Sequence, residues 1–557
     1  MPTVTVNNQP VEIGTDERLN CIQAAARVGV EIPAYCWHPA LSVVASCRMC
    51  LVEVGDRKPD GTVQMQPKLV PGCQTPARDG TVIVSDSAKV QEARKATLEY
   101  LLLNHPLDCP TCDQAGECFL QDYSFRYGRG FSRLQEPKNI KPDKDHIGEQ
   151  ITLFTDRCIM CTRCVRFTRE ISGTSELHVV SRGSHEEIDV FPGHPCDNKL
   201  AGNVVDLCPV GALCSKDFLY KQRVWWLKTA SSVCPGCSTG CSVHADQNED
   251  HVYRLTPRRN PLAQGDFMCD DGRFGWKYVH ANERLNSPAM RVSGRLVPRT
   301  WDAVMTSLWA AIRKSAAAGR IAAMLSPWMT VEEAWLLCTF LKQHSPEVAL
   351  AMAPVRTIGA DDHYPKDVRG NPVDPVRFTI RAEKCPNLRG VSAVLDHFTD
   401  ELLPFEELLR LASASQFRAV YLVGGDPAGW ITDLQAEAFS GTDVVIVQDL
   451  LPSPVLRHAT HTLAGGSFLE RDGVFVNHRG LAQRIQPSVR PVGDSRPDQR
   501  ILWELSERRG LYQGDLVRRE LAAAVPVFAG LEGVTAAEHG VLMDAGVHQA
   551  DSFVTRK

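Results

Sequence analysis

The cysteines of this 557-residue chain are numerous and unevenly placed. There are twenty, of which eighteen precede residue 270 and two follow it. The opening residues, Met1 to Val6, form neither a basic nor an apolar segment, so we expect no secretory signal and a reducing compartment. Thiols in such a compartment are metal ligands or buried side chains more often than disulfides. We therefore expect ligand chemistry in the N-terminal half and mostly scaffold in the C-terminal half.

Composition narrows the class of protein further. Apolar residues make up 43% and charged residues 23%, which is ordinary for a globular protein of several domains. The formal net charge of −5 provides no field that would attract nucleic acid. No stretch approaches the roughly 18 consecutive apolar residues of a membrane span, so membrane association is expected only through a partner.

The hydrophobic pattern changes along the chain. The first eighty residues combine a hairpin through Asn7-Asn8, a helix and further strands, which predicts a small α+β ferredoxin-like module. After residue 285, apolar strands alternate with helices, which predicts an α/β region with a parallel sheet. The expected strands are 3–6, 11–13, 50–54, 81–84, 419–423 and 444–447, and the expected helices include 17–29, 87–104 and 330–343.

The first two candidate ligand sets differ in kind. The first has the spacing C-x10-C-x2-C-x22-C, a variant of the plant-type [2Fe–2S] pattern with a longer first gap, although zinc also accepts four thiolates. The second has the spacing H-x3-C-x2-C-x5-C, in which three thiolates and one imidazole could bind the four irons of a cubane. The sets are Cys36, Cys47, Cys50 and Cys73, then His105, Cys109, Cys112 and Cys118.

The third and fourth sets consist of cysteine alone. A C-x2-C-x2-C run followed by a distant Cys-Pro is the [4Fe–4S] pattern of bacterial ferredoxins. The spacing C-x2-C-x3-C-x27-C precedes the α/β region, and zinc is its main competitor when the set is considered alone. The sets are Cys158, Cys161, Cys164 and Cys208, then Cys234, Cys237, Cys241 and Cys269.

Fifteen cysteines and one histidine thus complete four sets of four ligands. The remaining thiols are expected to be mostly small buried side chains. They are Cys21, Cys196, Cys214, Cys338 and Cys385.

The order of these sets resembles that in the large iron–sulfur subunit of bacterial NADH:quinone oxidoreductase, known as complex I. The resemblance extends over nearly the whole chain. It is carried by Tyr35-Cys36-Trp37-His38-Pro39, Ser46-Cys47-Arg48-Met49-Cys50, His105-Pro106-Leu107-Asp108-Cys109-Pro110, Arg157-Cys158-Ile159-Met160-Cys161-Thr162-Arg163-Cys164 and Leu207-Cys208-Pro209-Val210-Gly211-Ala212-Leu213. Later segments, Asn282 to Pro288 and Gly473 to Gly480, resemble molybdopterin oxidoreductases.

The resemblance implies a domain plan: a β-grasp [2Fe–2S] domain at 1–80, a His/Cys [4Fe–4S] module at 81–125, a ferredoxin-like [4Fe–4S] module at 140–225, a molybdopterin-oxidoreductase-type [4Fe–4S] domain at 228–283, an α/β domain lacking its cofactor at 284–505, and a C-terminal tail at 506–557. It also implies one [2Fe–2S] and three [4Fe–4S] clusters and no molybdenum.

The function implied is that of an electron-transfer subunit without a substrate site of its own. Electrons would come from an FMN-containing, NADH-oxidising subunit, cross the first, third and second sets in that order, and leave through a downstream ferredoxin-like subunit toward quinone. The fourth set lies off this line in the family. The implied location is peripheral, on the cytoplasmic side of the plasma membrane.

Two departures from the family are visible. The last gap of the first set is long, and Lys58-Pro59-Asp60-Gly61 indicates an inserted turn, which is tolerable because loop-closure cost grows slowly with length. The chain is also shorter than the longer members of this family.

Three alternatives remain at this stage. The catalytic subunit of a molybdenum formate dehydrogenase would need a molybdenum ligand, for which Cys385 is the candidate, but no histidine follows it closely. An NAD-linked hydrogenase complex shares the same ferredoxin modules, although we find no additional cysteine set for an iron-only hydrogenase cluster. A scaffold stabilised by zinc is the non-redox alternative. No G-x-G-x-x-G follows a strand and no phosphate-binding loop motif occurs, so NADH is expected to bind elsewhere.

Overall fold

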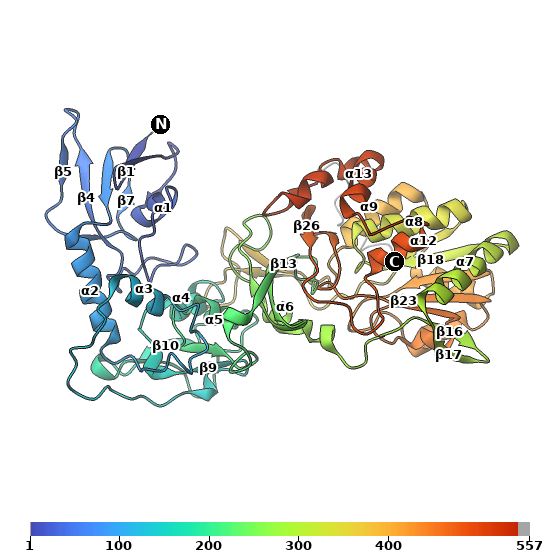
Figure 1. Ribbon diagram of the computed structural model, residues 1–557, viewed down its shortest axis with the longest axis horizontal. Coiled ribbons are helices and arrows are strands. Elements are labelled where there is room, and N and C mark those ends of the chain that lie inside the picture. The colour runs from blue at the N-terminus through green and yellow to red at the C-terminus, as the bar shows by residue number, and fades with distance from the viewer. Residues whose placement is uncertain (1, 544–557) are drawn as a thin grey trace. The chain divides into compact units, whose positions relative to one another are not determined.

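The computed structural model describes residues 2–543, which fold as two compact units (Figure 1). Among the described residues, the first unit comprises 2–227 together with Tyr364–Pro375, and the second comprises 228–363 together with 376–543. The excursion at 364–375 is fastened inside the first unit, where Lys366 N donates to Ile171 O at 3.0 Å. No helix within residues 2–543 has the length and apolarity that crossing a bilayer requires.

The first unit begins with a mixed sheet in the strand order β2-β1-β8-β4-β5. Strands β1 (Thr3–Val6) and β2 (Gln9–Glu12) pair antiparallel, as predicted, and Asn7 and Asn8 have the positive φ values of 43° and 67° that the tight turn needs. Strands β1 and β8 (Thr81–Val84) run parallel. The other strands of this region are β3 (Leu19–Asn20), β4 (Leu51–Arg57), β5 (Val63–Met65), β6 (Val70–Pro71) and β7 (Pro76–Ala77).

Two helices belong to this region, and one of them is shorter than predicted. The helix expected over 17–29 is observed as α1 (Cys21–Ala26). It begins after Asn20 because Asn20 forms a capping box, in which the Gln23 side chain accepts a hydrogen bond from the Asn20 backbone N–H. The helix expected over 87–104 is α2 (Ala88–Leu102), with the Ser87 side chain at its N-cap. The segment 58–61 forms a turn between β4 and β5, in which Gly61 N donates to Lys58 O at 2.9 Å.

The rest of the first unit consists of short elements that separate cysteine-bearing loops. Only short pieces of sheet occur here: β9 pairs with β12, and β10 pairs with β11. The elements are α3 (Phe119–Tyr127), β9 (Ile151–Leu153), α4 (Arg163–Glu170), β10 (Leu177–Val180), β11 (Glu187–Val190), α5 (Asn203–Leu207) and β12 (Leu213–Ser215).

The second unit opens with a three-stranded antiparallel sheet, followed by the predicted α/β region. The small sheet is formed by β13 (Lys228–Val233), β14 (Ser242–Asn248) and β15 (His251–Pro257), followed by α6 (Asp270–Phe274). The larger sheet has the order β17-β16-β24-β23-β22-β18-β19. Its strands are β16 (Ala289–Val292), β17 (Arg295–Pro298), β18 (Ile321–Leu325), β19 (Ala349–Met352), β22 (Ala419–Val423), β23 (Val444–Asp449) and β24 (His461–Ala464).

Five strands of the larger sheet run parallel, in the order β19-β18-β22-β23-β24. Their side chains alternate between two cores, so Ala323 and Leu325 pack in one and Ala322 and Met324 in the other. The first core contains residues of α7 (Trp301–Ala318), α8 (Val331–His344), α9 (Leu388–Phe398), α12 (Asp498–Leu505) and α13 (Gly514–Ala524). The second contains residues of α10 (Phe405–Ser413) and α11 (Asp433–Ala436). The sheet is therefore doubly wound.

The remaining strands of the second unit lie outside this sheet. They are β20 (Asp362–Tyr364), β21 (Phe378–Ile380), β25 (Gly473–Val476), β26 (Leu481–Ile485) and β27 (Val541–Leu542). The segment after 505 contributes α13 and β27, and Val517 and Leu521 of α13 are buried in the first core. This part of the chain is an integral piece of the second unit.

Candidate metal centres

The first ligand set gathers where the β-grasp sheet meets the long loop before β4. The thiols of Cys36, Cys47, Cys50 and Cys73 lie close enough together to perturb one another's pKa. Interaction with Cys47 and Cys73 lowers the pKa of the Cys36 thiol. A [2Fe–2S] cluster takes two thiolates on each iron, and four thiols gathered in one place can supply them.

The second set lies on the loop between α2 and α3. Cys118 is the N-cap residue of α3, and burial raises its pKa to about 11, with smaller contributions from Cys112 and Cys109. The structure therefore brings the three cysteines near one another. Cys109 is exposed, whereas Cys112 and Cys118 are buried.

His105 occupies a mostly buried position near this loop. Burial, followed by the charges of Lys138 and Arg157, lowers its pKa to about 4, and its Nδ1 atom has no hydrogen-bond partner within residues 2–543. A neutral imidazole with a free nitrogen is the form that binds metals. His105 and Cys112 share a neighbour, because the positive charge of Arg157 acts on the pKa of both side chains. This shared neighbour associates His105 with the second set.

The third set encloses a small cavity. All four of its cysteines line the cavity, together with apolar side chains such as Leu153, Ile188 and Val210. Burial raises the pKa of Cys158 to about 12 and of Cys161 to about 11, and mutual charge repulsion adds to both shifts. Thiolates in such a site need a metal to stabilise their charge. The donor set and the apolar lining of the cavity fit a cubane held by Cys158, Cys161, Cys164 and Cys208.

The fourth set lies in the second unit, at the ends of short elements. Cys234 follows β13 and Cys241 precedes β14, and Cys234 N donates to Cys241 O at 2.8 Å. Cys269 is the N-cap residue of α6. All four thiols are buried, and burial, followed by the charge of a neighbouring cysteine, raises the pKa of Cys234, Cys241 and Cys269.

Glycine is required beside two of these sets. A Cβ at Gly272 would lie 2.7 Å from Cys234 Sγ, and a Cβ at Gly211 would lie 2.2 Å from Cys112 Sγ. Both distances are below any normal non-bonded contact. Gly211 follows Cys208 by three residues, so the loop that carries a ligand of the third set also borders the second set.

Nowhere in residues 2–543 do three His, Cys, Asp or Glu side chains converge as they would around a single metal ion. A single zinc ion takes its thiolate and imidazole donors at about 2.0–2.3 Å. The ligands of an iron–sulfur cluster instead bind irons at the edge of the cluster, so they need not converge on one ion.

Arginines from the segment 157–166 connect the sets of the first unit. Arg166 donates to the carbonyls of Cys36 and Cys161, which belong to the first and third sets. Arg163 donates to Trp37 O at 2.6 Å and to Leu207 O at 3.3 Å, next to the same two sets. Arg163 lies inside the third cysteine run and Arg166 two residues after it, but only the structure shows this role.

One further arginine connects the third set to the second. Arg157, which precedes Cys158, donates to Asp108, which precedes Cys109, at 3.0 and 2.9 Å. The third set is therefore linked by hydrogen bonds to both of the others.

The five remaining cysteines are all buried. Cys21 donates to Thr75 O at 3.3 Å, and Cys338 is a residue of α8 that packs in the first core. Cys385 lies near Cys237 of the fourth set and near Asp426, and burial raises its pKa well above the ordinary value.

A cavity of about 290 Å³ lies beside Cys234 in the second unit. Its lining includes aromatic rings and two cations, among them Trp276, Trp328, Arg356 and Lys384. This volume is at the lower end of pockets that enclose one drug-sized ligand.

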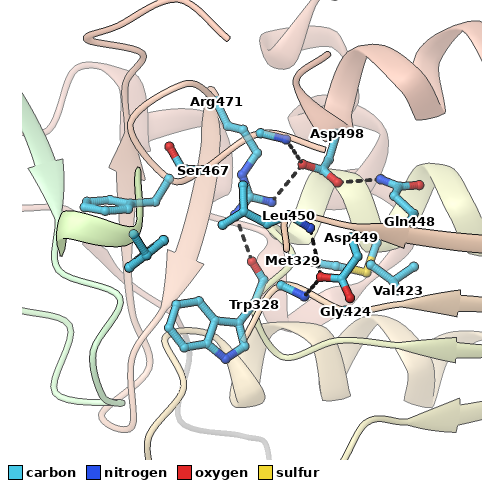
Figure 2. A pocket seen from close by; sticks show the side chains of 14 residues that line it. Trp328, Met329, Val423, Gly424, Gln448, Asp449, Leu450, Ser467, Arg471 and Asp498 are labelled. Atoms are coloured by element: carbon cyan, nitrogen blue, oxygen red, sulfur yellow. Dashed lines mark hydrogen bonds and ion pairs between the residues drawn. The ribbon is translucent and has the colours of Figure 1, made fainter. Parts of the chain in front are cut away.

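A second hollow lies at the carboxyl ends of the parallel strands. Strand β18 has β19 on one side and β22 on the other, and α/β sheets bind ligands at such a switch point. Figure 2 shows that charged side chains of the chain itself converge there. Arg471 lies 3.5 Å from Asp498 and donates to Trp328 O at 3.2 Å.

The carboxylates of this hollow are already well supplied with donors. Asp498 accepts from Gly466 N at 2.9 Å and from the Gln448 side chain (Figure 2). Asp449 accepts from Gly425 N at 2.9 Å and Trp430 Nε1 at 2.8 Å, and burial raises its pKa to about 6. The polar groups of this hollow thus pair with one another and with neighbours such as Trp430 and Glu333.

Five family models match successive parts of the chain. They are a 2Fe-2S iron–sulfur cluster binding domain at 1–88, an NADH-ubiquinone oxidoreductase-G iron–sulfur binding region at 94–133, the ferredoxin-like domain of NADH-quinone oxidoreductase subunit 3 at 148–214, a molybdopterin oxidoreductase Fe4S4 domain at 227–281 and a molybdopterin oxidoreductase domain at 389–508. Ferredoxin-like and 2Fe-2S domains are thus followed by a mixed α/β molybdopterin oxidoreductase domain, as predicted.

Curated relatives carry names consistent with these domains. The G subunit of the NADH-quinone oxidoreductase of Rickettsia bellii is 38% identical over 346 residues, which are 62% of this chain and 48% of the relative. The NADH-ubiquinone oxidoreductase 75 kDa subunit of Reclinomonas americana is 36% identical over 343 residues, which are 62% of this chain and 48% of the relative. The chain therefore spans about half the length of the curated relatives it matches.

One solved structure is also similar in part. It is titled as an NAD+-reducing [NiFe]-hydrogenase in the H2-reduced state, and the match has 27% identity and a TM-score of 0.34, covering 40% of this chain and 91% of the other. A TM-score this low supports no argument about fold. Over the residues that the sequence relatives match, the chain is a homologue of the large iron–sulfur (G) subunit of NADH-quinone oxidoreductases.

Proposed function

We propose that this chain relays electrons in a respiratory NADH:quinone oxidoreductase, as an iron–sulfur subunit without substrate chemistry of its own. The proposed cofactors are one [2Fe–2S] cluster at the first ligand set and one [4Fe–4S] cluster at each of the other three. Such clusters supply one-electron transfer, and the protein sets their potentials through ligand type, hydrogen bonds and burial. The sixteen proposed ligands are those of the four sets above, with His105 in place of a fourth cysteine in the second.

The observation that carries the proposal is the order in which hydrogen bonds connect the sets. Arg166 contacts carbonyls of the first and third sets, and the Arg157–Asp108 pair connects the third with the second. These hydrogen bonds join the third set to each of the other two, although it comes last of the three in sequence. This agrees with a route from first to third to second set.

The residues around the sets would fix ligand geometry and exclude water. Arg223 Nη1 donates to Cys112 O at 2.8 Å and so anchors the loop of the second set. Apolar side chains surround the third set, and Arg163 is buried beside it. Burial strengthens every electrostatic interaction with a cluster, so charges at these positions affect its potential strongly.

We further propose that the α/β domain holds no molybdopterin. Two features support this: the cavity beside Cys234 is small for a paired pterin cofactor, and Arg471 and Asp498, which line the strand-end hollow, pair with each other. Stoichiometric molybdenum in purified protein would contradict this and would direct attention to Cys385 as its ligand and to a formate dehydrogenase function.

The proposed partners are the other peripheral subunits of complex I. They are the NADH- and FMN-binding subunit upstream and a ferredoxin-like subunit downstream. The proposed location is peripheral, at the cytoplasmic side of the plasma membrane, held there by partner subunits.

Metal content and spectroscopy of anaerobically purified protein test the proposal. We expect about 14 irons per chain and broad visible absorption. A colourless protein that contains zinc would refute it, since zinc sites do not absorb there. Genes for membrane-pump subunits beside this one would favour complex I over a soluble hydrogenase or dehydrogenase.

The ligand role of His105 has its own test. In His105→Cys we expect a changed EPR signal for one cluster and unchanged signals for the other three. An untouched spectrum would exclude His105 as a ligand.

A further inference from the structure

Arg157 is a buried cation placed between the second and third ligand sets. Its residue is 5% exposed, and it directly precedes Cys158 of the third set. The guanidinium lies 3.9 Å from the centre of the Phe154 ring and donates two hydrogen bonds to Asp108 Oδ2. The side chain is therefore held in place from two directions.

One end of this guanidinium has no partner among residues 2–543. The Nη1 atom is buried and has no hydrogen-bond acceptor in that part of the protein, although Nε and Nη2 are both used. Leaving a buried donor unsatisfied costs about 1–3 kcal/mol, and more for a charged group. Such a donor next to a metal centre is expected to have an acceptor there when the site is loaded.

The neighbours of Arg157 indicate which ligand set would provide the acceptor for Nη1. His105 and Cys112 of the second set both feel its charge, and so does the buried thiol of Cys214. Asp108, the only carboxylate that accepts a hydrogen bond from it among residues 2–543, immediately precedes Cys109 of the same set.

We propose that Arg157 tunes the redox potential of the second cluster, donating its free Nη1–H to a sulfur of that cluster and placing a buried positive charge beside it. This inference rests on the proposed function, because it requires a cluster at the second set. Reduction adds a negative charge to the cluster. A nearby buried cation stabilises the reduced form more than the oxidised one and so raises the potential.

Asp108 gives the opposite electrostatic effect from the same ion pair. Its carboxylate places a negative charge near the cluster, so removing that charge should raise the potential. Removing the charge of Arg157 should lower it. A purely mechanical clamp predicts something else, because either substitution breaks the same Arg157–Asp108 contact and would disturb the cluster in the same way.

The experiment is an EPR-monitored redox titration of the full chain, purified anaerobically. The signal of the second cluster is the one that changes in His105→Cys. For Arg157→Gln we expect its one-electron reduction to become at least tenfold less favourable relative to the unsubstituted protein, which corresponds to a downward shift of about 59 mV. For Asp108→Asn we expect an upward shift.

Two further variants complete the design. Arg157→Lys retains the charge without the guanidinium fork and should shift the potential down by less than Arg157→Gln. Arg133→Gln is the control for loss of one positive charge, since the Arg133 side chain is largely exposed and pairs with Glu99. Arg133→Gln should leave the redox potential of the second cluster unchanged.

The outcomes distinguish failure of the tuning role of Arg157 from failure of the proposed function. Opposite shifts for Arg157→Gln and Asp108→Asn support a tuning role. Shifts in the same direction, or no shift in either, overturn it while leaving the cluster assignment intact. If Arg157→Gln fails to assemble the cluster, Arg157→Lys and Asp108→Asn still decide the sign. If the unsubstituted protein gives no signal that depends on His105, the proposed function fails first.

Discussion

Gly211 should be essential for the second cluster although it is not a ligand. Its substitution by alanine places a Cβ 2.2 Å from Cys112 Sγ. Contacts between non-bonded heavy atoms are comfortable at about 3.5–4.0 Å, so the sulfur has to retreat by more than about 1 Å. Ligand distances at a metal site are kept within about 0.2 Å. The required displacement is several times that tolerance, and the Arg223 hydrogen bond to Cys112 O opposes it.

We therefore expect Gly211→Ala to lose the second cluster. Iron analysis should show a loss of about four of about 14 irons per chain, and the EPR signal of that cluster should disappear while the others persist. Gly130→Ala is the matched control, because a Cβ there meets nothing within 4 Å. Full iron content and an unchanged second-cluster signal in Gly211→Ala would refute the packing argument.

Two further predictions concern the stability of the second unit. Arg284 and Glu470 form a bidentate pair at 2.7 and 2.8 Å whose side chains are 1% and 0% exposed, so Glu470→Gln should destabilise the unit by about 3–5 kcal/mol in urea unfolding. Glu507→Gln breaks an exposed pair with Arg313 and should cost less than about 1 kcal/mol, and similar losses in both variants would contradict the role of burial. The buried Asp449 carboxyl has its pKa raised from 3.8 to about 6, so its protonated form favours folding below pH 4 and this contribution, up to about 3 kcal/mol, is lost as pH rises through 6. Urea unfolding at pH 4 to 7 should show that fall in the unsubstituted chain and a weaker one in Asp449→Asn, whereas equal pH slopes would refute the assignment.

Local patterns predicted local structure well. The turn at Asn7-Asn8 was predicted, and α2 and α8 begin within one residue of their expected starts at 87 and 330, because turn residues and helical periodicity act over a few positions. The start of α1 was missed because the periodicity extends ahead of Asn20, while the capping box there begins the helix. Helix boundaries depend on such specific hydrogen bonds more than on periodicity.

Contacts between distant segments had no comparable signal. The grouping of the thiols into ligand sets stays a prediction from cysteine spacing, since ligands of one site are close in sequence for most of each set. Cysteine spacing could not show that the 208–211 loop borders Cys112, or that arginines at 157 and 166 connect different sets. These contacts depend on how the loops pack against each other, and no periodic pattern in a single sequence indicates such packing.

The excursion at 364–375 has a consequence for how the protein is made. These residues belong to the first unit, where Gly173 lies so close to Lys366 and Asp367 that a Cβ would be 2.3 Å from the Asp367 carbonyl. A ribosome releases residues 1–227 well before it reaches this segment, and domains otherwise complete their folding in order of synthesis. The first unit cannot reach its final form until much of the second has been translated. The proposed clusters of this unit would therefore have a long interval for insertion, in which three ligand sets are available and their surroundings are unfinished.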